Sequence, residues 1–436
     1  MKITIESSRV VKPTYNGSTP STNQHVPLSV FDKVTYNTHI AVIYAFNPPT
    51  PPNIAIEKGL SKVLAEYREW AGRLGEDAEG NLVIFLNDQG VRFVEATVDS
   101  KLRNVPPSKP TKEIQSLHPG LYGVEELVQV QLTRFTCGSI VIGFTAHHLV
   151  ADGHATSNFL VAWGLATRGL AIDPIPLHTR DTIFKPHELP LIQYDHRNIE
   201  YMNNKYVKTM SITDNESNEE EIVIHKVHFT NDFINKLRAK ASTGVPKPYS
   251  RFETTLAHLW RVITKARGLH GHETTQIRIS VNGRMRMDPK VPNEYFGNLV
   301  LWAFPRSKVR ELINRPLRYA VELIRAEVVK VNDSYFKSFI DFANSDIVSK
   351  EGLVSTADMN KITLSPDLEV DSWLTFPFFD LDFGSGSPHY FMPTYFATEG
   401  MLFLLPSYFG DGSVDAIVPL FKDNLDTFKM YCYSLD

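Results

Sequence analysis

Apolar residues recur along this chain with two spacings, one typical of strands and one typical of helices. Short runs rich in β-branched residues are too short for helices and predict buried strands. Longer segments place apolar residues three and four positions apart, which is the spacing of an amphipathic helix. Strands are expected near 3–5, 40–46, 140–144, 222–229, 277–281 and 299–303, and helices near 53–70, after Gly153, and near 231–241, 251–268 and 316–331. The mixture predicts an α/β fold.

One strand pair and one segment rich in breakers refine this pattern. The runs at 82–86 and 91–95 flank Asn87-Asp-Gln-Gly90, which predicts a β-hairpin. Residues 171–222 contain spaced prolines and end in an acidic run at 214–221. They predict an exposed crossover between domains.

The length of the chain predicts two domains. A chain of 436 residues is too long for one ordinary core, so two domains of about 200 residues each are expected. We place an N-terminal domain at 1–182, a linker at 183–221 and a C-terminal domain at 222–436. Part of 360–400 is expected to return to the first domain.

Composition removes several classes of function. The net charge of −4 provides no overall basic field, so no nucleic-acid partner is expected. Cys137 and Cys432 match no metal-ligand spacing, which predicts no metal site and suits a reducing cytosol. The first residues carry no signal or transit pattern, and no apolar stretch reaches the about 20 residues of a membrane span. The sequence therefore predicts a cytoplasmic protein with no membrane partner.

The main candidate for chemistry follows the strand near 140–144. His147-His148-Leu-Val-Ala-Asp152-Gly153 comes directly after it. A residue at the end of a buried strand is held rigidly, and an imidazole is the commonest general base near neutral pH. Gly153 is expected to let the backbone turn sharply without a Cβ clash. The alternative is a structural histidine and an ordinary capping aspartate, because a lone H-x-x-x-D pattern is loose.

A second candidate motif is Asp382-Phe-Gly384-Ser385-Gly386. No glycine-rich loop or catalytic-loop signature accompanies it, so it does not indicate a kinase. Two glycines beside an aspartate are typical of a tight turn. There is no G-x-S-x-G elbow, and neither cysteine lies near His148 in a nucleophile motif. The sequence therefore contains no recognisable nucleophile motif beside His148.

Together with Trp70-Ala-Gly-Arg-Leu74 and Tyr295-Phe-Gly-Asn298, these motifs resemble those of the plant BAHD acyl-CoA transferases. The similarity covers the chain in the same order and spacing. Closer matches to the amine-accepting members, such as the agmatine coumaroyltransferases, lie in Leu28–Lys33, Tyr67–Arg73, Tyr335–Asn344 and Tyr433–Asp436. The family has Trp where this chain has Ser385, so the motif formed by Asp382, Gly384 and Gly386 is expected to be structural.

The resemblance implies a fold similar to that of chloramphenicol acetyltransferase. It has two similar-sized domains, each a mixed sheet flanked by helices, and an active-site channel at their interface. It also implies transfer of a hydroxycinnamoyl group, such as coumaroyl or feruloyl, from CoA to agmatine or a similar amine. His148 would be the general base for direct attack in a ternary complex, and Asp152 would hold its loop by pairing with Arg284. By the same resemblance the product would be a phenolamide of plant defence, acyl-CoA would be a substrate, no cofactor is expected, and a monomer is the family default.

Acceptor recognition is expected at Asp371-Ser-Trp373-Leu-Thr375, where shikimate-accepting relatives read Thr-Ser-Trp-x-Arg. Side chains alternate along an extended segment, so Asp371, Trp373 and Thr375 would share one face. An acid beside an aromatic ring suits a guanidinium or ammonium group. Glu399 is a second candidate acid. The alternative is that Asp371 caps a turn and faces solvent.

Two further sites are assigned less sharply. Thr38, Asn298, the Trp373 indole N–H and backbone amides near His148 are all candidate oxyanion donors. CoA is expected near Ser250 and Arg251, at the start of a helix, where hydroxyl and guanidinium groups suit phosphate. An ordinary N-cap is the alternative for Ser250.

Three other functions stay open. A non-catalytic binding protein on this fold is one. A condensation-type domain of peptide synthesis is another, since it shares the pattern H-H-x-x-x-D-G. The third is the same donor chemistry with another acceptor: putrescine, tryptamine, tyramine, or an alcohol such as shikimate.

Overall fold

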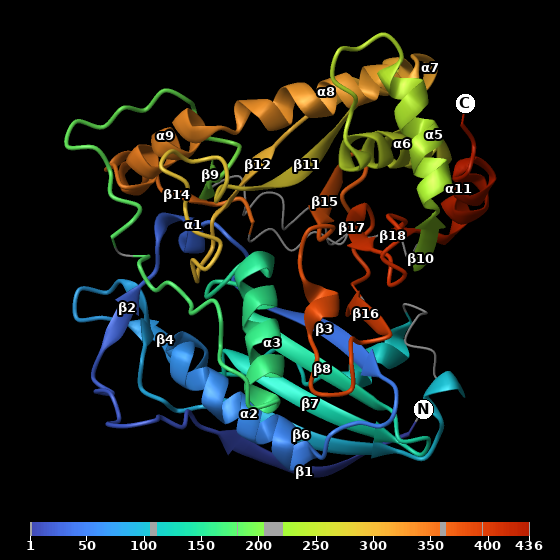
Figure 1. Cartoon of the computed structure of the whole chain (residues 1–436). Helices are drawn as coiled ribbons and strands as arrows, with labels where there is room; N and C mark the ends of the chain where they lie inside the picture. The colour runs from blue at the N-terminus through green and yellow to red at the C-terminus, as the bar shows by residue number, and fades with distance from the viewer. Residues whose placement is uncertain are drawn as a thin grey trace. The chain divides into compact units, whose positions relative to one another are not determined.

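The computed structural model describes residues 2–104, 111–180, 182–204, 221–357, 363–394 and 396–435. They form two compact units. The first comprises Met1–Pro190, Lys290–Leu299 and Phe376–Tyr395, and the second comprises Leu191–Pro289, Val300–Thr375 and Phe396–Asp436. Each unit contains a mixed β-sheet flanked by helices, as predicted (Figure 1). Apart from Glu221, the acidic run at 214–221 lies outside the described residues.

The first unit is built on a six-stranded sheet. Its strands are β1 (Ile3–Val11), β3 (His39–Phe46), β6 (Val91–Val98), β7 (Val128–Phe135), β8 (Ile140–His147) and β16 (Tyr390–Pro393). Their order is β1-β6-β7-β8-β3-β16, and only β6 and β7 run parallel to each other. The strand β16 extends the sheet at β3, so a late segment of the chain completes the first unit.

The predicted hairpin at 82–86 and 91–95 is wrong. A separate three-stranded sheet contains β2 (His25–Pro27), β4 (Arg73–Glu76) and β5 (Leu82–Phe85). β5 pairs with β2 and β4, whereas β6 pairs with β1 and β7. Asp88 lies between them with a φ of 51° and forms an ion pair with Arg68, so this stretch crosses from one sheet to the other.

Helices of the first unit pack closely on its sheet. The helical segments are α1 (Val30–Lys33), α2 (Asn53–Glu66), η1 (Arg68–Ala71), η2 (Leu102–Asn104), η3 (Lys112–Leu117), α3 (Gly153–Thr167) and η4 (Phe378–Asp380). α2 and α3 lie side by side on one face of the sheet (Figure 1). Trp163 donates from Nε1 to the Ile56 carbonyl at 2.9 Å. A Cβ on Gly59 would come within 2.0 Å of Thr167 Oγ1, so only glycine allows this approach.

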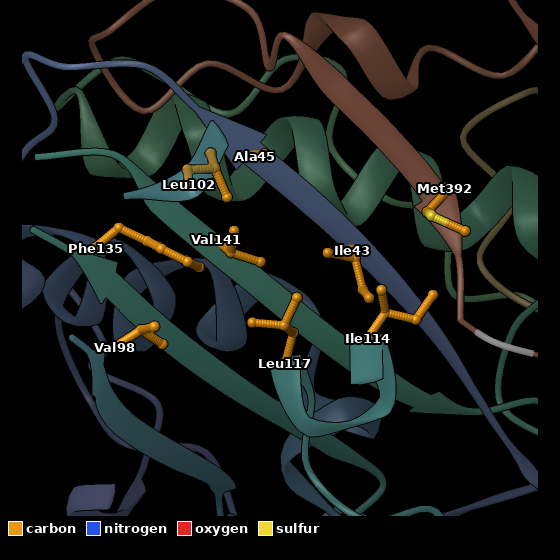
Figure 2. Packing of buried hydrophobic residues seen from close by; sticks show 9 residues of the cluster. All are labelled: Ile43, Ala45, Val98, Leu102, Ile114, Leu117, Phe135, Val141 and Met392. Atoms are coloured by element: carbon orange, nitrogen blue, oxygen red, sulfur yellow. The ribbon is translucent and has the colours of Figure 1, made fainter. Parts of the chain in front are cut away.

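The opposite face of the sheet is covered by η2 and η3. Val141 of β8 and Ile43 of β3 pack with Ile114 and Leu117 of η3 in a buried apolar cluster (Figure 2). The full cluster is Ile43, Ala45, Val98, Leu102, Ile114, Leu117, Phe135, Val141 and Met392. Since every residue of β8 is buried, this strand forms the centre of the unit, as its apolar run predicted.

The second unit contains a seven-stranded sheet. Its strands are β10 (Ile222–Phe229), β11 (Thr274–Asn282), β12 (Val300–Ala303), β13 (Arg306–Lys308), β15 (Leu368–Ser372), β17 (Met401–Pro406) and β18 (Val414–Phe421). The order is β10-β18-β17-β15-β11-β12, with β13 also paired to β11. β15 runs parallel to both of its neighbours, which makes this sheet mixed as well.

The helices of the second unit are α5 (Asn231–Ser242), α6 (Arg251–Ala266), α7 (Val309–Asn314), α8 (Leu317–Lys330), α9 (Asp333–Ala343), α10 (Ile347–Lys350), η5 (Lys422–Asn424) and α11 (Leu425–Tyr431). Three of them, α5, α6 and α8, agree with the predicted segments, whereas α7, α9, α10, η5 and α11 were not predicted. α6 contacts α5, α8 and α11 (Figure 1). A two-stranded ribbon joins β9 (Tyr201–Asn203) to β14 (Leu353–Ser355). None of the described helices is both long and apolar enough to cross a membrane.

Candidate active site

His148 is the first residue after β8, and α3 begins five residues later at Gly153. β8 is buried along its whole length, while the side chain of His148 is half-buried. His148 is therefore held at the end of a rigid strand, as the sequence predicted, and it is only partly buried.

The adjacent histidine has a different environment. His147 pairs with His39 across β8 and β3, and their rings meet edge to face at 4.8 Å. Burial, together with the nearby charges of His39 and His148, lowers the pKa of His147 to about 3. His147 Nδ1 accepts a hydrogen bond from the Leu149 backbone N–H at 3.4 Å. His147 is therefore a neutral structural residue.

Three hydrogen bonds fix His148 within the first unit. Its backbone N–H donates to the Thr38 carbonyl at 2.9 Å, and its carbonyl accepts from Asn298 Nδ2 at 2.9 Å. Its ring nitrogen Nδ1 lies 3.1 Å from Thr35 Oγ1. Among the described residues, Nε2 has no hydrogen-bond partner. This leaves Nε2 as the nitrogen that can exchange a proton with a substrate.

A buried ionic network supports these contacts, and sequence reasoning missed it. Asp32 accepts from the Asn298 backbone N–H at 3.0 Å, from Asn298 Nδ2 at 2.8 Å and from Arg180 at 3.0 Å. Arg180 also donates to the carbonyls of Val150 and Phe296. The side chains of Asp32 and Arg180 are 0% and 1% exposed. The one available signal was Ser29-Val-Phe-Asp32, a capping-box pattern that begins α1.

The Asp152 carboxylate makes structural contacts inside the first unit. One carboxylate oxygen caps α3 by accepting from the Ala155 N–H at 2.9 Å, and the other accepts from the Leu299 N–H at 3.0 Å. Asp152 thus joins the His148 loop to the residue after Asn298. Arg284 belongs to the second unit and is fully buried there, and its predicted pairing with Asp152 stays a prediction.

The reason given for Gly153 is wrong. Gly153 is not one of the described glycines with a positive φ, so its backbone conformation does not require glycine. A Cβ at this position would instead come within 2.7 Å of the Phe376 ring. The close approach of that ring is what excludes a side chain.

The structure also corrects one oxyanion candidate. Both amide hydrogens of Asn298 are already used, one by Asp32 and one by the His148 carbonyl. Asn298 therefore positions the main chain of His148 and has no hydrogen left for an oxyanion. Thr38 contributes its carbonyl to the His148 N–H, and the role of its hydroxyl stays a prediction.

The predicted acceptor residues lie at the end of β15. Asp371 is half-buried, and its Oδ1 accepts from the Ser280 hydroxyl at 2.7 Å. Trp373 packs edge to face on Phe403 with ring centroids 5.1 Å apart. β15 ends at Ser372, and Thr375 lies in a turn, so the alternation expected for an extended segment does not reach Thr375.

The second candidate acid has a structural partner. Glu399 is 0% exposed, and its two oxygens accept from Arg267 Nε at 2.9 Å and Nη2 at 2.8 Å. This buried bidentate pair leaves the carboxylate no accessible oxygen for an acceptor amine. The assignment of Glu399 to acceptor binding is therefore wrong.

The predicted CoA residues begin α6. Ser250 is its N-cap and forms a capping box with Glu253, so its hydroxyl accepts the Glu253 N–H. Arg251 is exposed, and its guanidinium lies 3.4 Å from the Gly412 carbonyl. The capping alternative accounts for the Ser250 hydroxyl, and CoA binding by this pair stays a prediction.

The Asp382 motif forms a tight turn. One oxygen of Asp382 accepts from the backbone N–H groups of Gly384, Ser385 and Gly386 at 2.7, 3.0 and 2.8 Å. The other oxygen pairs with Arg168 at 3.1 Å. Gly384 and Gly386 have φ values of 107° and 84°, which only glycine adopts freely.

One buried cluster links a serine, a histidine and a glutamate by hydrogen bonds in the order found in hydrolase triads, but its serine is not accessible to a substrate. His196 lies 2.9 Å from Glu200 and 3.2 Å from the Ser338 hydroxyl. Ser338 Oγ also accepts from the N–H groups of Gln193 and Tyr194 at 3.0 and 3.1 Å. His196 and Ser338 are 0% and 1% exposed. The serine cannot reach a substrate, so this cluster fixes the segment before β9 to α9.

Comparison with known proteins agrees with the sequence motifs. A model of the Transferase family matches residues 1–435. Agmatine coumaroyltransferase-1 of Hordeum vulgare is 54% identical over 440 residues, and putrescine hydroxycinnamoyltransferase 3 of Oryza sativa subsp. japonica is 55% identical over 444 residues. Each alignment covers 100% of both proteins. The crystal structure of vinorine synthase has a TM-score of 0.73 at 22% identity, covering 98% of this chain and 96% of that one, and supports the fold.

Proposed function

Since the chain belongs to the Transferase family, the BAHD acyl-CoA transferases, we propose that it transfers a hydroxycinnamoyl group from CoA to agmatine or a similar primary amine. The product is a phenolamide. The observation that carries the proposal is the ring of His148, which is fixed through Nδ1 and has no partner at Nε2 among the described residues. The full-length similarity to agmatine and putrescine enzymes supports the acceptor class.

The chemistry needs one base and one acid, and a single imidazole supplies both. A primary amine with a pKa of about 10 is mostly protonated at neutral pH, so only its neutral form attacks. As the amine nitrogen attacks the thioester carbonyl carbon, His148 Nε2 takes its proton. The carbon–sulfur bond then breaks, and the proton passes from Nε2 to the departing CoA sulfur. The amide and free CoA leave, and His148 returns to its starting form.

Acceptor selection is assigned to Asp371. A carboxylate attracts an ammonium or guanidinium group through charge-assisted hydrogen bonds. The contact with Ser280 holds one carboxylate oxygen in place on β15. Trp373 adds an aromatic ring two residues further on, and such a ring attracts cations.

Replacing Asp371 with Asn tests this assignment. Loss of one charged partner should lower kcat/KM for agmatine by roughly 10- to 100-fold, which corresponds to about 1.5–3 kcal/mol. The KM for coumaroyl-CoA should change little. Glu369 lies two residues earlier on β15 and pairs with Arg278 at 3.8 Å, so Glu369→Gln is a matched control for loss of charge on the same strand. Equal losses in both variants, or equal loss toward an uncharged acceptor, would assign Asp371 a structural role.

The choice among amines is decided by an acceptor panel with coumaroyl-CoA as donor. Agmatine, putrescine, tryptamine, tyramine and shikimate cover the dicationic, monocationic and anionic possibilities. The proposal predicts the highest kcat/KM with agmatine or putrescine. A preference for shikimate would overturn the amine assignment while leaving acyl transfer intact.

The proposal extends to the working form of the protein. We assign it a cytoplasmic location and a monomeric state, with a role in plant defence through the phenolamides it makes. A mass of 49.4 kDa by light scattering is the value expected for the monomer. A dimer at the protein's working concentration would contradict that part.

A further inference from the structure

We propose that Thr35 is a positioning residue for the reaction, because its hydroxyl oxygen accepts the Nδ1 proton of His148 and so leaves Nε2 free to act as the base. This inference rests on the proposed role of His148. It adds a residue that no sequence motif marks, and it assigns the tautomer of the imidazole.

The chemistry of a neutral imidazole makes this assignment necessary. One ring nitrogen carries the proton and the other carries the lone pair, and the hydrogen bond made by one nitrogen decides which is which. If Thr35 donated its hydroxyl hydrogen to Nδ1, the proton would sit on Nε2, which could then accept nothing from the amine. If Nδ1–H donates to Thr35 Oγ1 across the observed 3.1 Å, Nε2 keeps its lone pair.

Thr35 is held firmly enough for this role. It is 7% exposed and follows directly after the short helix α1 and its C-cap, Val34. The N-terminus of that helix is capped by a capping box between Ser29 and Asp32. Asp32 is also tied to Arg180 and Asn298, so the start of α1 is anchored in the buried network.

The same network fixes the other side of His148. Asn298, which is oriented by Asp32, donates to the carbonyl of His148 at 2.9 Å. Thr35 meets the ring of His148 at 3.1 Å. The buried Asp32 carboxylate therefore holds Asn298 directly, and it holds the start of the short helix that leads to Thr35.

The contact also matters at the intermediate stage. Once Nε2 has taken the amine proton, the imidazole is positively charged and both nitrogens carry hydrogens. The Nδ1–H bond to Thr35 is then charge-assisted and becomes stronger. Thr35 thus stabilises the protonated form through the same atom that sets the neutral tautomer.

The test replaces the hydroxyl while keeping the shape of the side chain. Thr35→Val should lower kcat by about 10- to 100-fold with little change in the KM for either substrate. Thr35→Ser keeps the hydroxyl and should restore kcat to within about three-fold of the parent value, a difference of less than 1 kcal/mol. Thr264 is buried in α6 and its hydroxyl has no hydrogen-bond partner among the residues that the structure describes, so Thr264→Val is the control for a buried threonine-to-valine change.

A spectroscopic measurement separates tautomer control from simple packing. With ring-¹⁵N-labelled histidine, the His148 signals, assigned by their loss in His148→Ala, should show the Nδ1–H form in the parent protein. In Thr35→Val they should move toward the Nε2–H form. If Thr35→Val does not fold, Thr35→Ala and Thr35→Ser provide the same comparison.

The outcomes separate this inference from the proposed function. Full activity in Thr35→Val or Thr35→Ala, an equal loss in Thr35→Ser, or an unchanged tautomer would overturn the role of Thr35 and leave His148 as the base. Retained activity in His148→Ala would overturn the proposed function itself.

Discussion

At the scale of single residues, burial and hydrogen bonding give neighbouring groups of one kind different chemistry. His147 and His148 are adjacent, yet burial lowers the pKa of His147 to about 3 and removes it from acid–base chemistry. His148 lies beyond the strand end and is half-buried. The sequence pattern indicated His148 by its spacing to Asp152, and the structure supplies the physical reason why His147 is unsuited.

The pair formed by His178 and Glu69 predicts how stability depends on pH. His178 Nδ1 lies 2.7 Å from Glu69. Burial lowers the pKa of His178, but the Glu69 charge and hydrogen bond outweigh it, and the net pKa is raised. Burial likewise raises the pKa of Glu69, but His178 and Arg180 outweigh it, and the net pKa is lowered.

The direction of the effect follows from these shifts. The contribution of His178 is complete below its unfolded pKa of about 6.5 and is lost as pH rises through the raised folded value. The contribution of Glu69 is present above its unfolded pKa of about 4.3 and is lost as pH falls through the lowered value. His178→Gln should therefore lower the free energy of unfolding more at pH 6 than at pH 8.5, by about 1 kcal/mol or less because solvent screens this partly exposed ring. Urea unfolding at the two pH values measures it, and equal losses would contradict the pairing.

The two cysteines predict a chemical test of direct transfer. Hydrogen bonds with the Ser139 side chain and the Leu102 backbone lower the pKa of Cys137 to about 7, whereas burial raises the pKa of Cys432 to about 12. Iodoacetamide at pH 7.5 should label Cys137 and spare Cys432, because the thiolate is the reactive form. Cys137→Ser should keep its kcat within about two-fold of the parent value, since direct attack uses no thiol. An acylated cysteine after incubation with coumaroyl-CoA alone would show that an acyl-enzyme forms.

At the scale of elements, β8 is the strand on which the site depends. Phe144 packs toward Phe159 of α3 on one face, and Val141 packs toward η3 on the other. Its apolar run predicted burial, and the structure confirms burial on both faces. The covering by η3 was not predicted, because η3 is short and polar at several positions and is held there by tertiary contacts.

Gly143 provides a test of that covering. A Cβ on Gly143 would lie 2.1 Å from the Leu117 carbonyl and 2.6 Å from the His118 Cα, so η3 must move to admit one. Gly143→Ala should therefore destabilise the protein by roughly 1–3 kcal/mol through overpacking. Gly120 has no neighbour within 4 Å of its Cβ position in the described part of the chain, so Gly120→Ala is the control. Equal melting temperatures for the two variants would contradict the close packing of η3 on β8.

At the scale of the whole molecule, the sequence predicted the features that depend on local residue patterns. It did not predict the features that depend on contacts between residues far apart in the chain. The fold class and the strands β3, β8, β10, β11 and β12 follow from periodicity and length. The hairpin at 82–95 was misassigned because strand pattern does not say which sheet a strand joins. The Asp32 network was missed because its partners are 148 and 266 residues away in the chain.

The remaining differences between the predicted and the observed site concern residues that support the site and do not contact a substrate. The spacing from His148 to Asp152 is local, so the sequence contained it. Asn298 and Glu399 both have side chains suited to substrate contact. Only the structure shows that Asn298 is bound to Asp32 and the His148 carbonyl, and that Glu399 is bound to Arg267, so that both are structural. Polar type alone does not distinguish a binding residue from a buried support.

The most direct measurement of the central claim is the rate of coumaroyl transfer to agmatine by His148→Ala, compared with the parent protein and with His272→Ala, which removes an exposed histidine. General acid–base catalysis contributes about 10²- to 10⁴-fold, so a loss of at least 100-fold in kcat is expected for His148→Ala alone. Its melting temperature and its affinity for coumaroyl-CoA should stay close to the parent values. A folded His148→Ala protein that keeps more than a few per cent of the parent kcat would contradict the account.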